Sequence, residues 1–155
     1  MTETDFSIVN AQIDALLTGE TNPVANLSNA SALLFDTITD INWAGFYLYN
    51  EETEALDLGP FQGKVACMHI NNGSGVCGTA FKTNTVTRVK NVHEFPGHIA
   101  CDSDSNAELV VPLEVSGKLI GVMDIDSKSL NRFSDDDQAG LTKFASVLAS
   151  HLDIA

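Results

Sequence analysis

The spacing of apolar residues predicts helices at both ends of the chain. Apolar side chains recur every three or four positions over 6–17, and we expect Thr4 to cap this helix and Gly19 to end it. Asn22 and Pro23 are typical of an N-cap and a first-turn proline, and they open a second helix that continues to about residue 38. Ser134, followed by three aspartates, predicts the start of a final helix that runs to about residue 152.

Between these helices, apolar and aromatic runs broken by turn residues predict strands. The expected strands are 42–49, 55–61, 64–70, 108–115 and 118–126. The first three suit a meander, and Ser116-Gly117 is a two-residue hairpin signal. A glycine-rich loop over 71–75 opens a short helix over 76–82, and 91–106 has the irregular composition of a long loop.

This order of elements predicts an α+β fold. Its central sheet is mostly antiparallel, and the N- and C-terminal helices pack on one face. We expect one domain over 1–155, because a chain of 155 residues can bury a core without disulfides or a structural metal.

Charge narrows the possible partners. The chain has 8 Lys+Arg against 21 Asp+Glu, a net charge of −13, which argues against nucleic acid and against anionic membrane surfaces. The N-terminus lacks the features of a secretory signal, and no apolar run is long enough to span a membrane. We therefore expect a cytoplasmic protein whose cysteines are thiols, so that any disulfide is transient.

Three cysteines and three histidines lie between positions 67 and 101. A zinc site is one interpretation, but Cys67, Cys77 and Cys101 lack the paired spacing of such sites, so we expect no metal. Thiol redox chemistry fits better because it requires only that cysteines meet in space. Cys67 could simply be a small buried apolar residue on a strand. Cys77 lies at the expected start of a helix, where main-chain amides can lower a thiol pKa. Cys101, in a polar loop, is the best candidate for an accessible nucleophile.

The sequence GSGVCG over 73–78 matches the dinucleotide-binding pattern G-x-G-x-x-G only formally. That pattern needs a parallel βαβ unit, whereas a polar loop and a hairpin follow here. The simpler interpretation is a tight turn into a helix.

Carboxylates and aromatic residues fall on the same strands as apolar residues. Glu108 begins an apolar strand, and Asp124 and Asp126 alternate around one residue and so share a face. Trp43 and Tyr47, four positions apart, also share a face. Buried carboxylates near a thiol favour a cationic ligand group, a protonated acid, or both, and an aromatic wall can hold a methyl or thioether group.

Five stretches of the chain closely resemble the free methionine-(R)-sulfoxide reductases, which are single GAF-type domains. They are NWAGFYLY (42–49), LGPFQGKVACMHI (58–70), GSGVCGTA (73–80), VHEFPGHIACDSDSNAELVVPL (92–113) and GVMDIDS (121–127). The resemblance runs from about residue 42 to the last helix, and all three cysteines are present.

The resemblance implies a mechanism. Cys101 attacks the sulfur of free methionine-(R)-sulfoxide and becomes a sulfenic acid. Cys67 then resolves it as a disulfide, with Cys77 as a second candidate, and thioredoxin restores the thiols. No cofactor is implied, a homodimer is expected, and the implied substrate contacts are Trp43, Tyr47, Glu108, Asp124 and Asp126.

A second hypothesis is a non-catalytic GAF-type module that binds a small ligand as a sensor, because one fold can serve unrelated functions. Thiol loss on mixing with methionine sulfoxide separates the two hypotheses.

Overall fold

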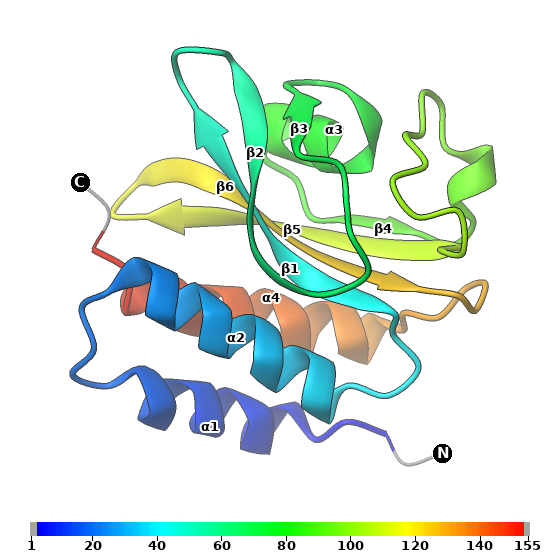
Figure 1. Ribbon diagram of the computed structural model, residues 1–155. Coiled ribbons are helices and arrows are strands. Elements are labelled where there is room, and N and C mark those ends of the chain that lie inside the picture. The colour runs from blue at the N-terminus through cyan, green and yellow to red at the C-terminus, as the bar shows by residue number, and fades with distance from the viewer. Residues whose placement is uncertain (1–2, 154–155) are drawn as a thin grey trace.

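The computed structural model describes residues 3–153 (Figure 1). Its elements follow the order α1 (Phe6–Leu17), α2 (Pro23–Thr37), β1 (Trp43–Asn50), β2 (Ala55–Gly63), β3 (His69–Asn71), α3 (Gly75–Thr83), β4 (Thr87–Val89), the 3-10 helix η1 (Val92–Glu94), β5 (Ala107–Val115), β6 (Lys118–Ser127) and α4 (Asp135–Ser150).

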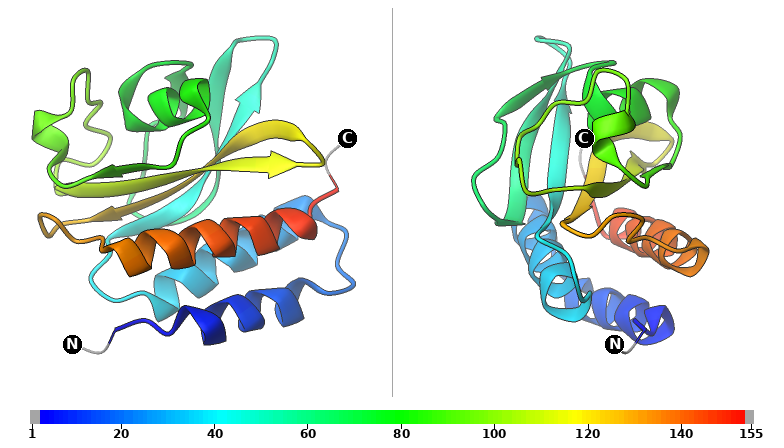
Figure 2. Two further views of the ribbon diagram at one scale, coloured as in Figure 1. Left: turned by 180° about the vertical axis from the view of Figure 1, so that it is seen from behind. Right: turned by 90° about the vertical axis from the view of Figure 1, so that its right-hand side faces the viewer.

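The strands form one six-stranded sheet in the order β3-β2-β1-β6-β5-β4, with every neighbouring pair antiparallel. Helices α2 and α4 pack on one face, and α1 packs outside them against α4 (Figure 2). Helix α3 lies over the other face. The predicted α+β fold is therefore confirmed, including the meander of β1 to β3 and the helices on one face.

The sheet separates two apolar clusters. The larger lies between the sheet and α1, α2 and α4, where Ile13, Leu34 and Phe144 are fully buried. The smaller lies beneath α3 and contains Trp43 and Tyr47. This second cluster forms the floor of the pocket described below.

Side chains at the helix N-termini explain where most helices begin. Asn22 accepts hydrogen bonds from main-chain amides of the first turn of α2, and Ser134 forms a capping box with Asp137 at the start of α4, as predicted. The predicted cap of α1 is wrong by one residue: Asp5, not Thr4, accepts from the amide of Ser7. Both are good capping types, so composition alone did not distinguish them.

Two strands differ from the prediction. The strand expected over 64–70 is confined to β3, because the carbonyl groups of Lys64 and Cys67 bond to side chains rather than to a neighbouring strand. Strand β4 was not predicted, since Thr87–Val89 is too short to show alternation. No helix within residues 3–153 combines the length and apolar character that a membrane crossing requires.

The turn before α3 explains the glycines of the GSGVCG stretch. Gly73 and Gly75 adopt positive φ angles of 86° and 63°, and the Gly73 amide bonds to the Gly78 carbonyl. With an antiparallel sheet beneath it, the stretch is a tight turn into a helix, as the simpler interpretation held.

Candidate active site

A small pocket lies on the α3 side of the sheet, between β1, β5 and β6 below and the loop 98–105 above. It encloses a cavity of about 40 Å³. The lining residues are Trp43, Tyr47, Ala66, Ile70, Ser74, Gly75, Val76, Cys77, His98, Ile99, Cys101, Asp102, Ser105, Glu108, Asp124 and Asp126. Seven of the eight residues predicted for the site are among them, and the eighth, Cys67, is bonded to Cys101.

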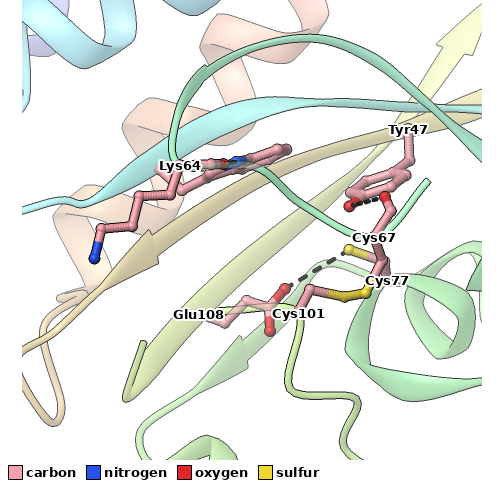
Figure 3. The surroundings of a disulfide bond; sticks show 7 residues. Tyr47, Lys64, Cys67, Cys77, Cys101 and Glu108 are labelled. Carbon is pink, nitrogen blue, oxygen red and sulfur yellow. Dashed lines mark hydrogen bonds between the residues drawn. A yellow bond between two sulfur atoms is a disulfide. The ribbon is translucent and has the colours of Figure 1, made fainter. Parts of the chain in front are cut away.

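Cys67 and Cys101 form a disulfide at the edge of this pocket (Figure 3). Their Cα atoms are 5.3 Å apart, although the residues are separated by 34 positions in the sequence. Both residues are half-buried. The bond joins the segment before β3 to the loop before β5, and Cys101 takes part in the pocket wall.

Cys77 is the third residue of α3 and a free thiol, with only 4% of its surface exposed. Its Sγ donates a long hydrogen bond of 3.6 Å to Glu108 Oε2 (Figure 3). The expectation that the helix start lowers its pKa is wrong: burial, followed by the charges of Asp124 and Glu108, raises the pKa of the Cys77 thiol. Cys77 is therefore a neutral thiol near neutral pH.

Three carboxyl groups meet on the pocket floor. Glu108 lies opposite Asp126 in the β5–β6 ladder, and Asp124 lies two residues along the same face. Glu108 and Asp124 are 8% and 5% exposed. One oxygen of Asp124 and one of Asp126 have no hydrogen-bond partner within the protein. These unpartnered acceptors point to a ligand that brings its own donors.

Burial and mutual repulsion govern the charge of these acids. Burial, with the charges of Asp126 and Glu108, raises the pKa of Asp124 well above its ordinary value. Burial and the charge of Glu108 raise the pKa of Asp126 in the same way. No lysine or arginine of residues 3–153 lines the pocket to offset these charges. Burial and mutual repulsion thus favour a proton shared by the Asp124–Asp126 pair.

Aromatic side chains line the pocket beside the acids, since Trp43 lies opposite Asp126 in the β1–β6 ladder. The rings of Trp43 and Tyr47 stack with centroids 5.9 Å apart, and Phe61 stacks on Trp43 at 5.2 Å. Trp43 and Tyr47 also fix the segment that carries Cys67. Trp43 Nε1 donates to the Lys64 carbonyl at 3.1 Å, and the Tyr47 hydroxyl donates to the Cys67 carbonyl at 2.9 Å. The prediction that they share one face is confirmed.

Polar contacts hold the loop that carries Cys101. Asn42 Nδ2 donates to Asp102 Oδ2 at 3.1 Å and to Ser105 Oγ at 3.0 Å, and Lys64 Nζ pairs with Asp104 at 2.9 Å. Asn42 and Ser105 were not predicted for the site, because a single polar residue beside a strand or in a polar loop carries no distinguishing pattern.

Cys77, Glu108 and Asp124 also offer ligand atoms that lie within 4.8 Å of one another. This thiol and these two carboxylates are the one group within residues 3–153 with the composition and spacing to hold a metal ion.

Comparison with known proteins agrees with this fold. The GAF domain family model matches residues 15–152, so the chain contains a GAF domain. The free methionine-R-sulfoxide reductase of Escherichia coli (strain K12) is 52% identical over 149 residues, which cover 96% of this chain and 89% of that protein.

Two solved structures are also similar. The reduced form of the Staphylococcus aureus fRMsr has a TM-score of 0.92 at 44% identity, covering 97% of this chain and 99% of that one. The free methionine-R-sulfoxide reductase of Neisseria meningitidis, in complex with its substrate, has a TM-score of 0.91 at 39% identity, covering 97% and 92%. The chain belongs to the free methionine-R-sulfoxide reductase family.

Proposed function

We propose that this chain reduces free methionine-R-sulfoxide to methionine, with Cys101 as the nucleophile and Cys67 as the resolving cysteine. The observation that carries the proposal is the Cys67–Cys101 disulfide at the edge of a pocket floored by buried acids. Family membership supports the substrate, and the disulfide supports Cys67 over Cys77 as the resolving residue.

The reaction balances with the residues at hand. The Cys101 thiol takes the sulfoxide oxygen, so that methionine leaves and Cys101 becomes a sulfenic acid. The Cys67 thiol then attacks the Cys101 sulfur, the disulfide forms, and water leaves. The enzyme donates two electrons and ends oxidised, so each turnover requires an external reductant.

The acid pair supplies the proton for the first step. A sulfoxide oxygen leaves poorly unless it is protonated, and the proton retained by Asp124 and Asp126 lies in the same pocket as Cys101. The remaining negative charge, including Glu108, binds the substrate ammonium group.

The pocket also explains a preference for the free amino acid. In a peptide, the methionine nitrogen is an uncharged amide, so buried carboxylates arranged for an ammonium lose their partner. The Trp43 ring covers the methyl group of the substrate, and Tyr47 completes that wall.

Thioredoxin is the proposed reductant, in keeping with a cytoplasmic location, and no cofactor is required. The proposal extends to a homodimer, which sedimentation velocity tests directly. The thioredoxin dependence and the homodimer are what the family resemblance implies.

Thiol counting tests the proposed reaction. Reduced protein mixed with methionine-R-sulfoxide should lose two thiols for each methionine formed. Cys101→Ser should abolish methionine release, whereas Cys67→Ser should release up to one methionine per enzyme and then stop. A sensor module would bind the ligand and lose no thiols, and unchanged turnover in Cys101→Ser would refute the proposal.

A further inference from the structure

The segment that carries Cys67 exposes apolar side chains on both sides of the disulfide. Val65 is 87% exposed and Met68 is 71% exposed, the two highest values among large apolar residues within 3–153. Ile99, two positions before Cys101, is a further 39% exposed. We call residues 64–68 the edge segment, because it leads directly into the edge strand β3.

This exposure is not that of a loosely held loop. The carbonyl groups of Lys64, Cys67 and Met68 all accept hydrogen bonds from the body of the sheet. The donors are Trp43 Nε1, the Tyr47 hydroxyl and, at 2.9 Å, the Leu58 amide. These three carbonyl groups fix the segment, and its apolar side chains face solvent in a defined arrangement.

Several main-chain amides of the same segment are unpaired. Within residues 3–153, the amides of Val65, Ala66 and Cys67 donate to no other main-chain group. A segment that continues an edge strand, with unpaired amides and exposed apolar side chains, is a surface to which another protein can add main-chain hydrogen bonds. The segment thus has both components of a peptide-like recognition surface, centred on a reactive sulfur.

The neighbouring charges are already paired. Lys64 pairs with Asp104 at 2.9 Å, and His69 pairs with Asp57 at 2.8 Å. The edge segment is therefore an apolar surface with an ion pair at its Lys64 end and a hydrogen-bonded His69–Asp57 pair at its β3 end.

The two cysteines of the disulfide differ in their position relative to the pocket. Cys101 lines the pocket, whereas Cys67 is absent from the pocket wall and lies between Val65 and Met68. A reductant too large to enter the pocket therefore reaches the disulfide from the Cys67 side. Figure 3 shows Cys67 and Cys101 joined by the disulfide, with the hydrogen-bonded pair Cys77 and Glu108 nearby.

We propose that the edge segment is the docking surface for a thioredoxin-type protein dithiol, whose attacking thiolate bonds to Cys67 Sγ. The inference rests on the proposed function, because only a turnover that ends in the disulfide needs such a partner. The Cys67–Cys101 bond breaks, and Cys101 leaves as a thiolate. The second thiol of the partner then attacks the mixed disulfide and releases Cys67, so the partner is oxidised and this chain gains two electrons.

Charge substitutions in the edge segment test the docking surface. Val65→Lys and Met68→Lys should each raise the KM for reduced thioredoxin about ten-fold, the loss expected when an apolar contact at the centre of an interface is removed. Turnover supported by dithiothreitol should stay within about two-fold, since a small dithiol needs no docking surface. Val24→Lys and Leu130→Lys are matched controls, because these residues are 64% and 59% exposed and lie in α2 and the loop before α4.

The outcomes separate the two proposals. An unchanged KM for thioredoxin in both edge-segment variants overturns the docking surface while leaving the reductase intact. Absence of turnover with dithiothreitol in the unsubstituted protein overturns the proposed function instead.

Trapping identifies the attacked sulfur. A thioredoxin whose second active-site cysteine is replaced by serine should form a stable mixed disulfide with the oxidised chain. Peptide mapping by mass spectrometry should find the partner on Cys67. Attachment to Cys101 would overturn the assignment of the attacked sulfur.

Discussion

The Tyr47 hydroxyl donates a 2.9 Å hydrogen bond to the main-chain carbonyl of Cys67, while the Tyr47 ring stacks beside Trp43 in the pocket wall. One side chain thus shapes the substrate wall and fixes the backbone position of the proposed resolving cysteine. The two roles can be separated by removing the hydroxyl alone.

Tyr47→Phe should slow disulfide formation and spare methionine release. Loss of a hydrogen bond typically costs about 0.5–1.5 kcal/mol, which corresponds to a change of about 2- to 10-fold in the rate of the second step. Single-turnover experiments that follow methionine and thiols separately measure the two steps. An equal slowing of both would show that the hydroxyl acts on the substrate and not on Cys67.

Cys77→Ala should retain methionine release and disulfide formation, with turnover within about three-fold of the unsubstituted protein. The reason is that Cys77 is buried, carries a raised pKa and remains a free thiol beside the Cys67–Cys101 bond. Thiol counting and mass mapping of the oxidised variant check the result. Loss of the second step would instead assign Cys77 a place in resolution.

Asp124→Asn should abolish turnover but raise stability at neutral and alkaline pH. The pKa of Asp124 is raised in the folded protein above the ordinary value of 3.8, so the folded state holds a proton that the unfolded chain releases. The free energy of unfolding therefore falls as pH rises through the interval between these two pKa values. In Asp124→Asn this fall should be smaller, as measured by urea unfolding between pH 4 and 8.

Asp57→Asn is the matched control of opposite sign. The hydrogen bond from His69 lowers the pKa of Asp57, so its contribution to stability is present above the ordinary pKa and is lost as pH falls through the lowered one. Because this loss lies below the ordinary pKa of 3.8, the Asp57→Asn series extends the urea unfolding to pH values below 3.8. If Asp124→Asn and Asp57→Asn change the slope of stability with pH in the same direction, the charge assignment in the pocket is wrong.

The disulfide form should bind methionine weakly. A cavity of about 40 Å³ holds only about three water molecules, too few for the side chain of an amino acid to replace. Cys67→Ser, which cannot form the bond, should therefore bind methionine at least about ten-fold more tightly than the oxidised protein. Isothermal titration of both proteins measures the ratio, and equal affinities would show that the disulfide does not close the pocket.

The elements with strong local signals could be predicted from the sequence. Asn22, Ser134 and Ser116-Gly117 mark their helix starts and hairpin because the determining interaction lies within a few residues. The 64–68 region was misread as a strand because its carbonyls bond to Trp43 and Tyr47, more than 20 positions away in the case of Lys64, and such partners leave no local pattern.

In the candidate site, too, features set by nearby residues could be predicted, and features set by distant residues could not. Alternation placed Asp124 and Asp126 on one face, and composition selected Cys101 as a loop thiol. The raised pKa of Cys77 could not be predicted, because it depends on burial beneath α3 and on carboxylates from two other strands. The role of Asn42 could not be predicted either, because its partners Asp102 and Ser105 lie some 60 residues away in the sequence.

The 34-residue separation of Cys67 and Cys101 also couples catalysis to heat resistance. Closing a loop of that length lowers the entropy of the unfolded chain enough to stabilise the oxidised form by about 3–4 kcal/mol. A falling supply of reductant would then leave a population that is both inactive and harder to melt or digest. The melting temperature of this chain, measured in a cell extract, would therefore report the fraction of the protein that is in the oxidised, disulfide-bonded form.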